Sequence, residues 1–156
     1  DITKGEISMG DDVFISIEDI GELYLSAVLV YFEYPRVFVC IDTYDNKYIF
    51  YEMASDDENK DIWLVSQVKE SEYYDIIDGR SSIQSVYEKG KSSNIFSVTK
   101  IYGEEDQIII SYDNVESLRT SLPKNDVFAD SKVLNEILVK ARTTRMVSGI
   151  GSLSLS

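Results

Sequence analysis

The stretch YPRVFVCIDTYDNKYIFYEMASDDENKDIWLVSQV, residues 34–68, determines the fold that the sequence predicts. It holds three apolar runs, at residues 35–41, 47–53 and 62–68, in which aromatic and β-branched side chains favour a pleated strand. Asp- and Asn-rich residues at 42–46 and 55–61 separate these runs, and such side chains favour turns because they bond the nearby backbone. The stretch therefore predicts three consecutive antiparallel strands with Trp63 in their core.

The residues before this stretch predict two further strands. Residues 13–17 form a short apolar run, and residues 22–32 contain good strand formers on both faces. The second run predicts a long central strand that is buried on both sides. Counting in steps of two places five of its side chains on one face: Leu23, Leu25, Ala27, Leu29 and Tyr31. A helix is the alternative for residues 22–32.

The residues after the stretch change from strand to helix periodicity and back again. Residues 71–79 predict a short helix with Ser71 as N-cap and Gly79 just beyond its end, and residues 81–90 predict a second one. Residues 94–102 and 107–112 predict a hairpin. Residues 133–146 predict a last, amphipathic helix. The fold class is α+β: an antiparallel twisted sheet of about five to seven strands, with short helices on one face and a C-terminal helix.

The chain of 156 residues has the length of one ordinary domain. We expect a flexible N-terminal segment at residues 1–12 and an α+β domain at residues 13–122. Pro123 and the polar residues after it predict a linker. The linker and the C-terminal helix together span residues 123–147. Residues 148–156 are rich in Gly and Ser and predict a loose tail.

Charge and composition narrow the classes of partner. The formal net charge is −13, a field that repels nucleic-acid phosphates and anionic membrane surfaces. We therefore expect no nucleic-acid partner and no membrane partner. The single cysteine, Cys40, excludes an internal disulfide and favours a reducing, cytoplasmic location. Cys40 lies between Val39 and Ile41 in an apolar run, so we expect it to be buried and inert.

The sequence holds no recognisable catalytic motif. It lacks His, which removes the commonest general base and most zinc sites, and it lacks a Gly-rich phosphate loop. Acidic turns at residues 42–45, 56–61 and 104–106 do not match the spacing of a calcium loop. We therefore predict no catalytic residue, no metal and no cofactor, and the interpretation leans away from an enzyme.

The predicted C-terminal helix is the best candidate for a partner-binding segment. Its charge is basic on an otherwise acidic chain, with only Glu136 opposing Lys132, Lys140, Arg142 and Arg145. The residues predicted to bind a partner are Val133, Leu134, Ile137, Leu138, Lys140, Arg142 and Arg145. Ala141 completes the apolar stripe, which is too apolar to face water. The stripe packs on its own chain or makes an intermolecular contact, and for the second case we expect a homodimer or another protein partner.

Several segments resemble an uncharacterised family of small bacterial domains. The similar residues are 35–40, the turn of Asp42 and Asp45 leading to Tyr48, Trp63 with Leu64 before Val68, and residues 77–83. The resemblance implies a bacterial or phage-encoded cytoplasmic protein and transfers no activity and no functional residue. The basic C-terminal segment lies outside it.

The function that these observations favour is a non-catalytic protein–protein interaction or regulatory subunit, in a bacterial or phage defence-related assembly. Two alternatives stay open at this point. One is an enzyme that depends on a divalent metal held by carboxylates, and the other is an acidic inhibitor that mimics DNA.

Overall fold

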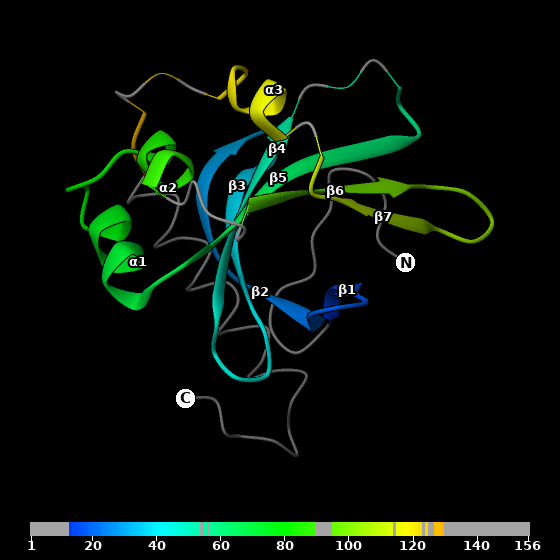
Figure 1. Cartoon of the computed structure of the whole chain (residues 1–156), viewed down its shortest axis with the longest axis horizontal. Helices are drawn as coiled ribbons and strands as arrows, with labels where there is room; N and C mark the ends of the chain where they lie inside the picture. The colour runs from blue at the N-terminus through cyan, green and yellow to red at the C-terminus, as the bar shows by residue number, and fades with distance from the viewer. Residues whose placement is uncertain are drawn as a thin grey trace.

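The computed structural model describes residues 13–53, 55, 57–89, 95–113, 115–122, 124 and 127–129. Within them the chain forms one seven-stranded antiparallel sheet, whose strands lie side by side in sequence order, and three short helices (Figure 1). The strands are β1 (Val13–Ile17), β2 (Gly21–Phe32), β3 (Tyr34–Ile41), β4 (Lys47–Met53), β5 (Lys60–Val68), β6 (Ile95–Ile101) and β7 (Gln107–Ser111). The helices are α1 (Glu70–Ile77), α2 (Ile83–Lys89) and α3 (Val115–Arg119).

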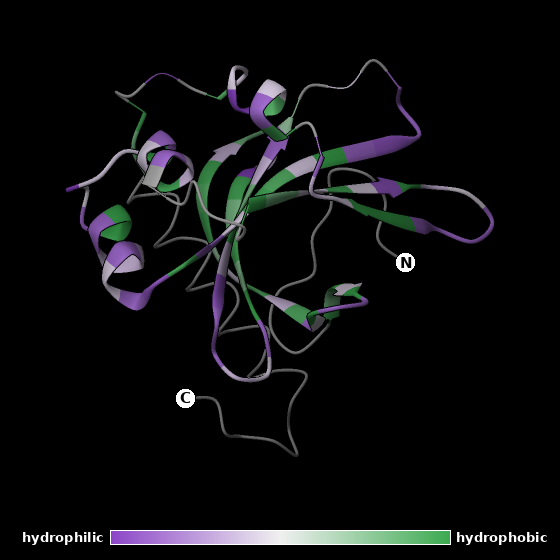
Figure 2. Ribbon diagram, viewed as in Figure 1, coloured by the Kyte–Doolittle hydropathy of each residue, from purple (hydrophilic) through white to green (hydrophobic). Residues whose placement is uncertain are grey.

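The predicted meander of β3, β4 and β5 is confirmed, with antiparallel registers that run without interruption. Hydrophobic residues predominate in these strands, although β5 begins with Lys60 and Asp61, and hydrophilic residues lie in the turn between β3 and β4 (Figure 2). Trp63 is buried in the core, as predicted. The antiparallel sheet with short helices agrees with the expected α+β class.

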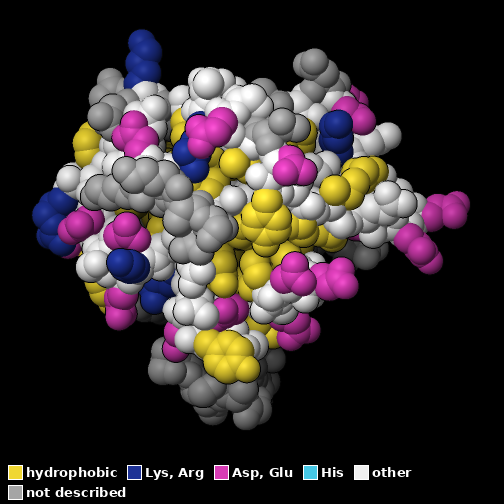
Figure 3. Space-filling view, viewed as in Figure 1, with side chains coloured by type: hydrophobic (Ala, Val, Ile, Leu, Met, Phe, Trp, Pro, Cys, Tyr) yellow, Lys and Arg dark blue, Asp and Glu magenta, His cyan; other side chains and the backbone are white. Residues whose placement is uncertain are grey.

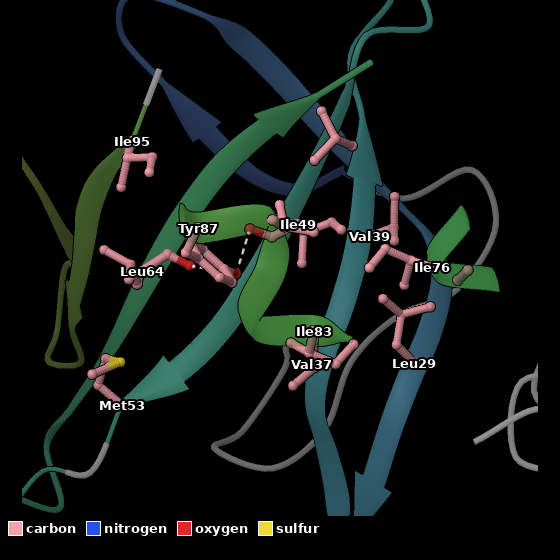
Figure 4. Close-up of a cluster of buried hydrophobic side chains, with 13 residues drawn as sticks. Leu29, Val37, Val39, Ile49, Met53, Leu64, Ile76, Ile83, Tyr87 and Ile95 are labelled. Atoms are coloured by element: carbon pink, nitrogen blue, oxygen red, sulfur yellow. Dashed lines mark hydrogen bonds between the residues drawn. The ribbon is translucent and has the colours of Figure 1, made fainter. Parts of the chain in front are cut away.

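One face of the sheet packs against the helices (Figure 4). Ile76 of α1 and Ile83 and Tyr87 of α2 are fully buried against this face. They contact a cluster of aliphatic side chains from the inner strands, which includes Leu29, Val39, Ile49 and Leu64. The helices therefore supply the apolar cover that this face needs to leave water.

The other face carries a second, more aromatic cluster. The ring of Phe14 on β1 lies 5.1 Å from that of Phe38, 5.9 Å from that of Phe50 and 5.7 Å from that of Trp63. These three partners belong to β3, β4 and β5, although β1 pairs only with β2. The sheet therefore bends until β1 lies over its own inner strands, which gives a shape close to a barrel (Figure 1).

Strand β2 produces part of this bend and corrects one expectation. It is a long strand with buried side chains on both faces, as predicted. Its face assignment was wrong, because Leu23 and Leu25 join the aromatic cluster whereas Ala27 and Leu29 join the helix-covered cluster. The register with β3 shifts between Leu25 and Ala27, and a bulge there places Ala27 on the face opposite to Leu25.

The helix boundaries also differ from the sequence prediction. Helix α1 begins two residues earlier than expected, with Lys69 rather than Ser71 as N-cap, and the Lys69 amide donates to the Glu72 carboxylate over 2.8 Å. Gly79 does follow the helix with φ of 76°, as predicted. Helix α3 was not predicted, because a segment of five residues is too short to show a helical period.

Other predictions concern residues that the structure does not describe. The flexible segment at residues 1–12, the C-terminal helix at residues 133–146 and the tail at residues 148–156 lie outside the described residues. In the predicted linker, the Ile83 amide donates to the Val127 carbonyl over 2.9 Å. Val127 and Ala129 pack against the helix-covered cluster, so this part of the segment contacts the domain.

Candidate functional site

The acidic turns were the sequence candidates for cation binding, and the first of them is occupied by local hydrogen bonds. The Asp42 carboxylate accepts hydrogen bonds from the Tyr44 amide at 2.8 Å, the Asn46 amide at 2.9 Å and the Asn46 side chain at 2.9 Å. Burial works to raise the pKa of Asp42, but these hydrogen bonds outweigh it and the pKa lies below its ordinary value. Asp42 therefore holds the β3–β4 turn in shape.

The carboxylates of the other turns have separate partners. Asp61 is buried and accepts a hydrogen bond of 2.6 Å from the Tyr102 hydroxyl, which joins β5 to the end of β6. Burial, followed by the bond to Asp61, raises the pKa of the Tyr102 hydroxyl. Asp57 accepts from the Asn59 amide at 2.8 Å. Among the residues described by the structure, no group of three or more His, Cys, Asp or Glu is placed to hold a metal ion.

Cys40 lies in the aromatic cluster and is fully buried. Burial raises the pKa of its thiol well above the ordinary value, because the thiolate would lose its hydration. The predicted burial is thus confirmed. Its slow reaction with thiol reagents stays a prediction.

Strand β7 forms one edge of the described sheet, so one side of its backbone has no partner strand within that sheet. Strand β7 pairs with β6 alone, in a regular register from Ser97–Ser111 to Ile101–Gln107. Its sequence is QIIIS, which contains neither a charge nor a proline. Proteins usually protect sheet edges with charged residues, prolines or bulges. The opposite edge, β1, has an irregular register between Val13 and Ile15, so β7 is the less protected of the two.

A set of partly exposed apolar side chains accompanies this edge. We call this set the apolar seam. Its members lie on the two edge strands or next to them, and they pack against the aromatic cluster. They are Phe14, Ile20, Ile108, Ile110 and Tyr112. Tyr112 is 52% exposed, and its ring lies 5.6 Å from that of Phe96. Ile109 is 50% exposed and, by strand alternation, lies on the other face of β7.

Carboxylates lie next to both ends of β7. Glu104, Glu105 and Asp106 precede it in the exposed β6–β7 turn, and the exposed Asp113 follows it. Asp106 forms an ion pair of 3.8 Å with Lys100, so part of this charge is already neutralised. Figure 3 shows hydrophobic side chains gathered near the centre of this face, with Asp and Glu side chains around them. Strand β7 is therefore an apolar sheet edge with acidic residues at both ends.

The model of a family of unknown function, DUF6575, matches residues 11–145. The chain belongs to the DUF6575 family. This agrees with the uncharacterised domain that the sequence resembles, and it corrects the extent of that resemblance, because the matched region includes Lys140, Arg142 and Arg145. The basic segment is therefore part of the DUF6575 region. Neither the curated proteins nor the solved structures gave a match.

The structure of this DUF6575 domain adds a site that sequence reasoning missed. The seven residues predicted to bind a partner, from Val133 to Arg145, lie outside the described residues, so the structure does not place them. The sequence predicted β7 only as the second strand of a hairpin, and it did not predict the apolar seam. The signal in the sequence was the run Ile108–Ile110, which lies in the last strand of the sheet as the described residues form it. No helix in the described part of the chain has the length and apolar character to cross a membrane.

Proposed function

We propose that this chain is a non-catalytic protein-binding or regulatory subunit, with the β7 edge and the apolar seam as its contact surface. The observation that supports the proposal is an uncharged, regular edge strand beside partly exposed apolar side chains, of which Tyr112 is 52% exposed. Protein partners commonly use both features, since an edge strand offers backbone hydrogen bonds and an apolar patch offers area to bury.

The binding role is favoured over a carboxylate-based metal enzyme, because the carboxylates described above lie in separate turns, some bonded to their own backbone. It is favoured over an acidic DNA mimic because those turns do not form a continuous row along a helix or strand. The bacterial or phage-encoded origin, the cytoplasmic location and the defence-related assembly belong to the proposal and derive from the sequence resemblance and the single cysteine. The predicted partner-binding segment at residues 133–145 stays part of it as a second contact.

Selection from a random library tests the proposal, because such a selection does not require the natural partner. The full chain is immobilised and a phage-displayed library of random peptides is selected on it. We expect enriched peptides whose binding is lost in the variant Ile110→Glu, which places a charge in the apolar seam. The matched control is Ile109→Glu, the same substitution one residue away on the other face of the same strand, and it should retain binding to the seam.

Circular dichroism establishes that both variants are folded before they are compared. Should Ile110→Glu fail to fold, Tyr112→Glu replaces it, with Tyr44→Glu as its control, since both tyrosines are exposed and only Tyr112 lies at the seam. The proposal is wrong when no peptide is enriched, or when the enriched peptides bind all seam variants as well as the wild type.

A further inference from the structure

We infer that the partner segment binds in extended form, as an eighth strand added to β7, and that it carries Lys or Arg at both ends. This inference rests on the proposed function and specifies its ligand: a short strand with apolar residues at every second position, flanked by basic residues. Each part of the description follows from a separate property of the edge.

The extended form follows from the backbone of β7. An antiparallel edge strand directs the N–H and C=O groups of alternate residues away from its neighbour. Pairing with β6 is regular along all five residues of β7, so the outward groups form an evenly spaced row. A helix satisfies its own backbone and cannot use that row, whereas an added strand pairs with it.

The apolar alternation follows from the side chains of β7. Ile108 and Ile110 face the aromatic cluster, Tyr112 continues the same face, and Ile109 projects from the opposite one. Side chains on an added strand lie about 5 Å from their neighbours across the pair, on the same face. Every second residue of the added strand therefore lies against the apolar seam, and an apolar side chain at these positions buries the seam.

The basic ends follow from the charges that flank β7. Glu104, Glu105 and Asp106 lie before the strand and Asp113 lies after it, so both ends of an added strand meet carboxylates. The same charges disfavour a second copy of β7 as the partner. Antiparallel self-pairing centred on Ile109 would place the acidic turn of one copy beside Asp113 of the other.

The chain itself contains one basic segment, and its sequence pattern argues against it as the occupant. Residues 131–156 hold four basic and one acidic side chain, a formal charge of +3 in a chain of −13, so the other residues carry −16. Between Lys132 and Lys140 the apolar residues follow a helical period, not the alternation of a strand between basic ends. We therefore assign the edge to a segment of a different protein, and occupancy by this chain is an outcome of the test.

The probe is a synthetic peptide, Lys-Lys-Val-Thr-Val-Thr-Val-Lys-Lys, added to the 15N-labelled full chain. We expect amide shifts at residues 107–111 and near Phe14 of the seam, and no shifts in the β3–β4 turn at residues 42–46. Replacing the four lysines by glutamate should weaken binding at least tenfold. Raising the salt from 50 to 500 mM should weaken the lysine peptide about tenfold, because exposed charge pairs are screened. Shifts of equal size with both peptides, or no shift at 2 mM peptide, overturn the inference.

N-methylation distinguishes a strand from a helix. Two forms of the lysine peptide carry one N-methyl group each, at adjacent central residues. In an added strand one of these amides faces β7 and the other faces solvent, so one form loses binding and the other keeps it. A bound helix loses its internal hydrogen bonding in both forms, and equal loss contradicts the extended form.

The outcomes separate this inference from the proposed function. Library peptides that bind the seam but have no basic ends, or that bind as helices, refute the inference and leave the binding role intact. Outward β7 amides that are already protected from exchange in the free chain refute it as well, and the mass in solution then shows whether this chain or a second copy occupies the edge.

Discussion

Tyr87 connects the helical layer to two strands through one hydroxyl group. It lies on α2, is fully buried, and its hydroxyl is 3.1 Å from the Ile49 carbonyl and 3.2 Å from the Leu64 carbonyl (Figure 4). The hydroxyl has a single hydrogen to donate, shared between two acceptors on β4 and β5. Burial raises the pKa of this hydroxyl well above its ordinary value, so it remains a donor at all ordinary pH values.

The substitution Tyr87→Phe should lower the free energy of unfolding by about 1 kcal/mol, the usual contribution of a buried hydrogen bond. Urea unfolding followed by circular dichroism measures the change. Tyr44→Phe is the control, since Tyr44 is exposed at the β3–β4 turn and loss of its hydroxyl should leave the free energy of unfolding unchanged. Equal effects of the two substitutions would show that the hydroxyl of Tyr87 is not part of the core bonding.

Asp42 predicts a dependence of stability on pH. Its pKa is below the ordinary value of about 3.9 in the folded chain, so it stabilises the fold above that pH. This stabilisation is lost as the pH falls through the lowered value. Asp42→Asn should cost about 1–2 kcal/mol at pH 7 and flatten the decline in stability below about pH 4. Unfolding free energies at pH 7 and pH 3 measure both effects, and a variant with an unchanged acid response would contradict this role.

At the scale of elements, the helix-covered face of the sheet is fully buried under α2 but remains half exposed at β7. Ile83 on α2 is fully buried, whereas Ile109 on β7 is half exposed. Ile83→Ala should destabilise the chain by about 2–5 kcal/mol, and Ile109→Ala by less than about 0.5 kcal/mol. Urea midpoints of the two variants give the comparison. A large loss for Ile109→Ala would mean that this side chain already packs against something in the free protein.

The elements also show how far sequence reasoning reaches. The meander was predictable because Asp42 and its neighbours mark a turn between apolar runs. The face assignment of β2 was not, because apolar residues occupy both faces of this strand and the polar residue that follows Leu25, Ser26, does not by itself reveal a bulge. The β7 edge was missed for a related reason: the pattern of Ile108–Ile110 predicts a strand, but only the order of the sheet makes it an edge.

At the scale of the whole molecule, the basic C-terminal segment is the second contact that we propose. Its apolar stripe includes Val133, Ile137 and Leu138, and we predict that it makes an intermolecular contact, with a homodimer as the form. A chain that ends at Asp130 should remain folded and become monomeric, which light scattering and circular dichroism measure together. In the full chain, high salt should weaken the contact because Lys140, Arg142 and Arg145 then attract acidic turns less.

Two results would contradict that prediction. An unchanged oligomeric state after truncation would show that the segment is not the assembly element. Unfolding of the truncated monomer would show that the stripe belongs to the core of its own chain.

The sequential order of the strands has a consequence for folding kinetics. Neighbours in the sheet are neighbours in sequence, and the link between β2 and β3 is the single residue Glu33, so most pairings close short loops. Only β5 and β6 are separated by a long insertion, which contains α1 and α2. Closing a longer loop costs more entropy, so we expect β1–β5 to form before β6 and β7 join. During synthesis the N-terminal strands also emerge first. The binding edge is then the last part of the sheet to exist, and a nascent chain presents it only once the rest has folded.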